Sequence, residues 1–141
     1  MSFDAIDDAF HYVSNAPPGE RSAVVRRSSG QVYLASLKAD FDERPAGSET
    51  DPAYVAIPHR RQLDPGMPLF LDFVAGHCPA ERSRFEALFA RPGGFRNAKE
   101  QLRRLGLLES WQLFEEQQIA ELLRRWCTAQ GLALEEARTR K

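Results

Sequence analysis

The sequence contains few cysteines and no long hydrophobic run. Its two cysteines, Cys78 and Cys127, fit neither a disulfide framework nor a C-x-x-C metal or redox motif. Unpaired thiols are typical of reducing compartments, so the sequence favours a cytoplasmic protein. No apolar segment approaches the roughly 20 residues that cross a bilayer, and residues 1–8 are acidic where a secretory signal is basic and then apolar. We therefore expect neither a membrane segment nor a secretory leader.

The sequence also lacks the short motifs that mark common catalytic and ligand-binding sites. It contains no P-loop, dinucleotide fingerprint, nucleophile elbow or zincin motif. A chain of 141 residues can bury one core without a stabilising metal or cofactor. The sequence therefore predicts a single domain over residues 1–141, with no cofactor, no metal and a function that we expect to be non-enzymatic.

The charges nearly cancel over the whole chain but are unevenly distributed along it. The 19 Lys and Arg residues are matched by 20 Asp and Glu residues, which excludes a protein that coats nucleic acid over its whole surface. Residues 82–104 contain seven basic residues against two acidic ones, whereas residues 40–51 contain five acidic residues against one arginine. The sequence therefore offers one basic segment and one acidic loop as candidate surfaces.

A helix and a hairpin are predicted near the N-terminus. Apolar residues at three- and four-residue steps indicate a helix over about residues 4–14, with Asp4 at its N-cap. Residues 22–27 and 31–36 are rich in β-forming residues and flank Ser28-Ser29-Gly30, where glycine can take a positive φ. This pattern is typical of two antiparallel strands joined by a short turn.

Helical spacing dominates the C-terminal half of the chain. A buried helix is predicted after Gly66, and a second begins at Pro79 and ends near Phe89. A short third helix ends at Gly106 in the manner of a left-handed C-cap. The longest helix continues through about residue 129, before a polar tail.

These elements together predict the α+β class. Residues 38–52 show no periodicity and are expected to form a loop, while residues 53–57 are a predicted third strand. The expected architecture is a small three-stranded antiparallel sheet with an N-terminal helix in residues 1–62. This layer is expected to pack on a block of about four helices in residues 63–141.

The C-terminal half carries a resemblance to a known family. The motif Gly94-Phe95-Arg96-x-x-Lys99 is followed by Leu102, Gly106, Trp111, Phe114 and Trp126-Cys127. With this order, and with the hairpin and short strand before it, the chain resembles the bacterial uncharacterised protein family (UPF) 0158 over nearly its whole length, most specifically over residues 94–127. The resemblance implies this fold and a bacterial cytoplasmic setting, but no activity. The chain departs from the family pattern at Asn97, where an aromatic is usual, so any contact made by that aromatic is missing here.

The basic segment contains the candidate binding site. Arg96, Lys99 and Arg103 follow one another at steps of three and four, so a helix places them on one side. Gly93 and Gly94 precede them and are expected to leave backbone N–H groups accessible at the positive end of the helix, where phosphate or carboxylate groups bind. The predicted anion-binding residues are Gly93, Gly94, Arg96, Lys99, Arg103 and Arg104. We expect a binding module for an anionic partner, and nucleic acid is one such partner.

Other interpretations of the charged segments stay open. A basic stripe opposite an apolar face is often the solvated side of a helix, and the acidic loop 40–51 is an internal partner that could neutralise it. The alternative function is a protein–protein adaptor that uses the hairpin edge or this loop. In that case Arg26 and Arg27 would protect the edge strand from self-association.

Aromatic residues in the longest helix are expected in the core. Trp111, Phe114 and Trp126 resemble stacking platforms for nucleobases, but they coincide with the apolar face of the helix. Cys127 follows Trp126 in apolar surroundings and is expected to be a small buried side chain rather than a nucleophile.

His77 and Cys78 form the one pair that suggests covalent or metal chemistry. An imidazolium beside a thiolate would activate it, and His59 would supply a third zinc ligand. Adjacent residues rarely ligate one metal with good geometry, however, and Asp40 with Asp42 lacks the ligand spacing of a calcium loop. We therefore expect no metal site.

Overall fold

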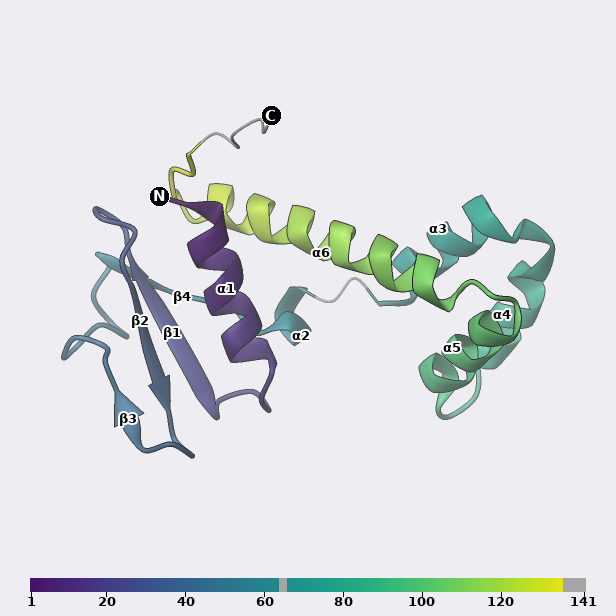
Figure 1. Ribbon diagram of the computed structural model, residues 1–141, viewed down its shortest axis with the longest axis horizontal. Helices are drawn as coiled ribbons and strands as arrows, with labels where there is room; N and C mark the ends of the chain where they lie inside the picture. Colours follow the sequence, from purple (N-terminus) through teal and green to yellow (C-terminus); the bar gives the residue numbers. More distant parts are fainter. Residues whose placement is uncertain (64–65, 136–141) are drawn as a thin grey trace. The chain divides into compact units, whose positions relative to one another are not determined.

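The computed structural model describes residues 1–63 and 66–135 (Figure 1). The chain divides into two compact units. The sheet unit comprises Met1–Asp64 and Ala120–Lys141, and the helical unit comprises Pro65–Ile119. Helix α6, Leu108–Ala129, therefore contributes its first part to the helical unit and its last part to the sheet unit. None of the helices in the described ranges is both long and apolar enough to cross a membrane.

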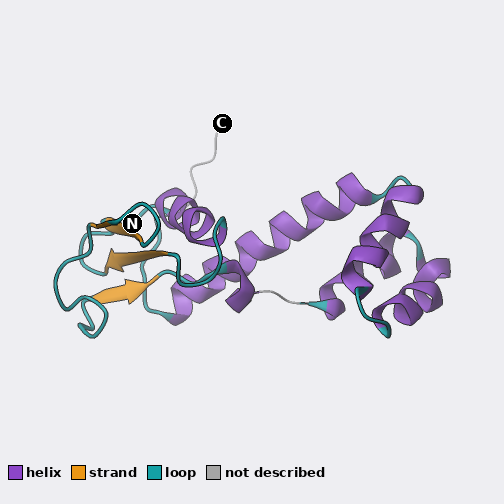
Figure 2. Ribbon diagram, turned by 90° about the horizontal axis from the view of Figure 1, so that it is seen from below, coloured by secondary structure: helices purple, strands orange, loops and turns teal. Residues whose placement is uncertain are grey.

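Four short antiparallel strands form the sheet, in the order β3-β2-β1-β4. Figure 1 labels the strands, and Figure 2 draws strands in orange and helices in purple. The strands are β1 (Arg21–Arg26), β2 (Val32–Ser36), β3 (Phe41–Asp42) and β4 (Tyr54–Ala56). The predicted hairpin is confirmed, since Val24 of β1 pairs with Tyr33 of β2. On its other side Val24 pairs with Ala56 of β4. The α+β class is therefore confirmed, with an antiparallel sheet beside helices.

Two expectations about the sheet were wrong. Three strands were expected, but β3 lies inside the predicted loop 38–52 and pairs with the end of β2, where Ser36 is opposite Phe41. A strand of two residues is too short to show alternation, so the sequence gives no signal for it. The pairing also places β1 inside the sheet, so Arg26 and Arg27 do not protect an edge strand. The edges are the short strands β3 and β4.

Helix α1, Phe3–Ser14, packs against the sheet through its apolar face. Its buried residues are Ile6, Ala9, Phe10 and Val13, which is the predicted periodicity. Its first residue is Phe3, so the N-cap position belongs to Ser2 rather than to Asp4, which lies in the first turn. An acidic residue in the first turn is still favourable because the N-terminus of a helix is positive. A four-residue helix, α2 (Arg60–Leu63), follows β4 and was not expected from the sequence.

The start of the chain lies along the end of α6 within the sheet unit. The N-terminal ammonium of Met1 donates to the carbonyl oxygen of Ala133 at 2.9 Å, and the Glu135 N–H donates to the Met1 carbonyl at 2.7 Å. The Arg124 guanidinium lies 3.8 Å from the centre of the Phe3 ring. These contacts close the sheet unit with residues that are far apart in the sequence.

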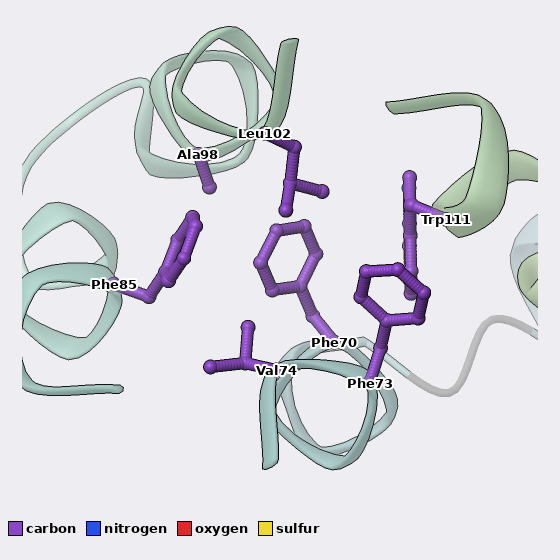
Figure 3. Close-up of a cluster of buried hydrophobic side chains, with 7 residues drawn as sticks. All are labelled: Phe70, Phe73, Val74, Phe85, Ala98, Leu102 and Trp111. Atoms are coloured by element: carbon purple, nitrogen blue, oxygen red, sulfur yellow. The ribbon is translucent and has the colours of Figure 1, made fainter. Parts of the chain in front are cut away.

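The helical unit is built around a cluster of aromatic side chains (Figure 3). Its helices are α3 (Met67–His77), the 3-10 turn η1 (Pro79–Glu81), α4 (Arg82–Phe89), α5 (Gly94–Arg104) and the first part of α6. Phe70 of α3 lies at the centre, with its ring centroid 4.7 Å from that of Trp111 and 5.3 Å from that of Phe85. Ala98 and Leu102 of α5 complete this core.

The end of α5 follows the predicted glycine signal. Gly106 has a φ of 74°, and its N–H donates to the Arg103 carbonyl at 3.1 Å while the Leu107 N–H donates to the Leu102 carbonyl at 2.8 Å. These two bonds form a Schellman motif, which requires the left-handed conformation that glycine adopts without strain. The predicted end of this helix at Gly106 is confirmed.

Candidate anion-binding site

Helix α5 presents one apolar face and one basic face. Ala98 and Leu102 are fully buried in the helical core, whereas Arg96 and Lys99 are exposed. The helix is continuous from Gly94 to Arg104, so steps of three and four place Arg96, Lys99 and Arg103 on the side opposite that core. The structure therefore places these three cations on one solvent-facing surface, which we call the α5 basic face.

The N-terminus of α5 begins after a glycine and lacks a side-chain cap. Gly93 occupies the N-cap position with a φ of 75°, and no side chain caps the first N–H groups. A Cβ on Gly93 would lie 3.5 Å from Nη2 of Arg96 and 3.9 Å from Nδ2 of Asn97. Two side-chain donors therefore lie beside the uncapped backbone donors, at the positive end of the helix. Asn97 contributes one of these donors.

Gly94 has a packing role that the sequence did not predict. A Cβ at this position would lie 2.8 Å from both the Leu88 carbonyl oxygen and the Phe89 Cα, which are backbone atoms of α4. The close approach of α4 and α5 therefore requires glycine here. The two glycines therefore have different roles. Gly93 adopts the left-handed N-cap conformation, and Gly94 allows the backbones of α4 and α5 to approach closely.

Glu100 pairs with two of the predicted cations. Arg103 donates from Nε to Oε1 of Glu100 at 3.2 Å, and its Nη2 also contacts this carboxylate. Nε of Arg104 lies 3.8 Å from Oε2 of the same residue. By contrast, no carboxylate within the described ranges forms an ion pair with Arg96 or Lys99. The four predicted cations therefore differ. Arg96 and Lys99 near the helix start have no carboxylate partner among the described residues, whereas Arg103 and Arg104 near its end share Glu100.

The acidic loop contains an internal ion pair. Arg44 donates from Nε to Oδ1 of Asp42 at 2.9 Å and from Nη2 to Oδ2 at 2.8 Å. These hydrogen bonds stabilise the carboxylate and lower the pKa of Asp42 to about 2. The loop thus neutralises part of its own negative charge.

His77 and Cys78 do not form an activated thiol. The His77 ring is stacked on the Phe73 ring at a centroid distance of 4.1 Å, and its Nδ1 lies 3.1 Å from the Phe73 carbonyl oxygen. Burial and the nearby Glu81 carboxylate raise the pKa of the Cys78 thiol, which favours its neutral form. The described residues contain no group of three His, Cys, Asp or Glu side chains that could hold a metal ion.

We expect Cys78 to react slowly with thiol reagents. Because only the thiolate is nucleophilic, a raised pKa reduces the reactive fraction near neutral pH. The measurement is the rate of iodoacetamide labelling at Cys78, followed by peptide mass spectrometry in the native protein. The same protein unfolded in urea provides the reference, and faster labelling in the native state would contradict the expectation.

Trp111 belongs to the core, as predicted, and Phe114 packs against it. Trp111 is 2% exposed, and its ring packs on Phe70 and Phe73. Phe114 is half-buried against the same cluster, and Trp126 is also half-buried. Cys127 is fully buried, and burial raises the pKa of its thiol. These positions do not provide an exposed stacking platform.

A comparison of the chain with family models, curated proteins and solved structures finds no match. The resemblance to family 0158 therefore stays a prediction, as do the bacterial origin and cytoplasmic setting that it implies.

The sheet unit contains a cleft that no signal in the sequence indicates. The cleft has a volume of about 580 Å³. Its lining comes from five separate segments, represented by Val13 of α1, Val24 of β1, Ser48 of the acidic loop, Ile57 after β4 and Arg61 of α2. No spacing rule connects these positions, because tertiary folding alone brings them together.

Proposed function

We propose that the protein is a binding module for nucleic acid and that the α5 basic face recognises the phosphate backbone. The observation that carries this proposal is the uncapped N-terminus of α5, flanked by Arg96 and Asn97, with the exposed Lys99 one turn further along the helix. Helix N-termini bind phosphate groups because their N–H groups point at the ligand and the helix dipole favours negative charge.

The charge of this face suits a polyanion. Arg96 and Lys99 have no carboxylate partner among the described residues, so each is able to neutralise a phosphate without breaking an ion pair. Arg103, the third cation of this face, shares the single carboxylate of Glu100 with Arg104, which lies beside the face. The net charge of the face is therefore positive, although the whole chain carries a formal charge of −1. Local positive potential of this kind attracts nucleic acid to one surface.

Replacing both unpaired cations, in the double variant Arg96→Ala and Lys99→Ala, is expected to weaken nucleic-acid binding. Each phosphate contact that is lost also removes its counterion release, so the slope of log affinity against log salt should become about two units less negative. The measurement is fluorescence anisotropy of labelled single-stranded and duplex oligonucleotides of mixed sequence, titrated with the full chain at several salt concentrations.

A matched double variant, Arg82→Ala with Arg125→Ala, controls for the loss of two positive charges. Both arginines are exposed and paired with glutamates on their own helices, outside the α5 basic face. We expect this variant to bind as the unmodified protein does. Equal losses in the two double variants, or an affinity that does not change with salt, would contradict the proposal.

A further inference from the structure

The cleft in the sheet unit has the size and lining of a small-molecule site. Its volume of about 580 Å³ is within the usual range for ligand pockets, roughly 300–1,000 Å³. Val24 of β1 and Ala56 of β4 are paired in register and line the cleft side by side. Tyr54, two residues before Ala56 on β4, adds apolar surface on the same face of the sheet. This lining suits the apolar body of a small ligand.

Ser48 contributes a polar group that lacks a partner. Its side chain is 4% exposed and lines the cleft, and its Oγ has no hydrogen-bond partner among the described residues. The Ser48 N–H donates to the Pro45 carbonyl at 3.1 Å, so a turn holds the residue in place. Buried hydroxyl groups normally form hydrogen bonds, and a ligand in the cleft would satisfy this one.

Arg61 contributes a cation to the lining, and His59 anchors the backbone of Arg61. The His59 Nδ1 accepts from the Arg61 N–H at 3.1 Å, which leaves the hydrogen on Nε2 to be donated to the Ala16 carbonyl at 2.8 Å. Both ring nitrogens are therefore occupied in holding the start of α2 beside the cleft. The Arg61 side chain is exposed, and no carboxylate in residues 1–63 or 66–135 forms an ion pair with it.

The remaining charges in the lining indicate a single surplus positive charge. Arg44 is neutralised by its two hydrogen bonds to Asp42. Arg21 donates to the Tyr12 carbonyl at 3.1 Å and keeps its charge, while Glu49 supplies a negative charge to the lining. With Arg61, these groups leave one cation in excess. A singly charged anion matches this balance better than a doubly charged phosphate does.

We propose that this cleft binds a small organic monocarboxylate. The apolar body lies on Val24, Tyr54 and Ala56, and the carboxylate accepts hydrogen bonds from the Arg61 guanidinium and the Ser48 hydroxyl. A guanidinium matches the two oxygens of a carboxylate, and hydrogen bonds to ionised groups are the strong ones. The site belongs to the sheet unit, so it provides a second binding activity that does not depend on the α5 basic face.

The test uses three carboxylates of different shape, 2-naphthoate, octanoate and 3-phenylpropionate, with the neutral 2-naphthamide as the matched control ligand. Each is titrated into the ¹⁵N-labelled full chain while amide resonances are followed by NMR. At least one carboxylate should shift the resonances of Gly19, Ser48 and Ile57 saturably. We expect 2-naphthamide to bind about tenfold more weakly than 2-naphthoate, because it lacks the charge that Arg61 pairs with.

Substitutions then test the two polar groups separately. Arg61→Gln should weaken carboxylate binding about tenfold and leave the binding of 2-naphthamide unchanged. Lys38→Gln makes the same charge change at an exposed residue outside the cleft and should have no effect. Ser48→Ala should also weaken carboxylate binding without lowering the thermal unfolding temperature, because its Oγ makes no hydrogen bond to the described residues. Failure of all three carboxylates to bind saturably would overturn the proposal, as would equal affinity in Arg61→Gln and Lys38→Gln.

Discussion

Replacing Phe70 with Ala is expected to lower the free energy of unfolding by about 3–5 kcal/mol, the largest loss that we predict for a single substitution in this protein. Phe70 is fully buried, and its ring lies within 5.3 Å of the Phe85, Phe89 and Trp111 ring centroids. Removing the ring leaves a cavity at the meeting point of four helices. The rings around it are held by separate helices and cannot all move inward to fill it.

Urea unfolding followed by far-UV circular dichroism measures this loss. The matched control is Phe41→Ala, which deletes the same ring from β3, where Phe41 is 39% exposed. This control should cost about 1–2 kcal/mol, because part of the ring is already exposed and its removal leaves no enclosed cavity. A typical domain is stable by only about 5–15 kcal/mol, so the difference between the two variants is large enough to resolve. Equal costs for Phe70→Ala and Phe41→Ala would show that the aromatic cluster does not support the helical unit.

Strong periodicity made the helical unit predictable from the sequence. Phe85, Leu102 and Trp111 recur at helical spacing with neighbouring apolar residues, whereas the run around Phe70 is apolar on more than one face. All four residues are buried in the core of the helical unit. Glycine at position 106 marked the end of α5 correctly, because its left-handed φ of 74° is a local requirement. Local signals of this kind do not depend on distant parts of the chain, so sequence analysis detects them.

The missed features depend on partners that are distant in the sequence. Strand β3 exists because the end of β2 has backbone groups to pair with, and Phe41–Asp42 has no strand pattern of its own. The contacts of Met1 with Ala133 and Glu135 join the two ends of the described chain. The sheet-unit cleft likewise depends on five segments that only folding brings together.

The residues of the candidate site could be predicted from the sequence, but their ion pairs were not. Helical spacing placed Arg96, Lys99 and Arg103 on one face, as the structure has them. The ion pairs of Glu100 with Arg103 and Arg104 were not predicted, although their spacing of three and four residues is typical of such pairs on a helix. The packing role of Gly94 could not be predicted, because it depends on the backbone of α4, which lies close to Gly94 only in the folded protein.

Replacing Glu100 with Gln should strengthen nucleic-acid binding. The substitution keeps the size of the side chain but removes the negative charge, so Arg103 and Arg104 become available for phosphate contacts. If both engage, the slope of log affinity against log salt should become about two units more negative, and affinity at low salt should rise about tenfold. Exposed ion pairs of this kind contribute about 0–1 kcal/mol each, so the fold should tolerate the change.

The matched control is Glu121→Gln on α6, which removes the same charge from an exposed pair with Arg125 at 3.3 Å. Both variants raise the net charge of the chain by the same amount. Their affinities for nucleic acid should therefore differ only if the binding surface lies on α5. A gain in Glu100→Gln alone locates the phosphate contacts on the end of α5 as well as on its start. An equal gain in both would show that overall charge governs the affinity, and no gain in either would confine the contacts to Arg96, Lys99 and the helix N-terminus.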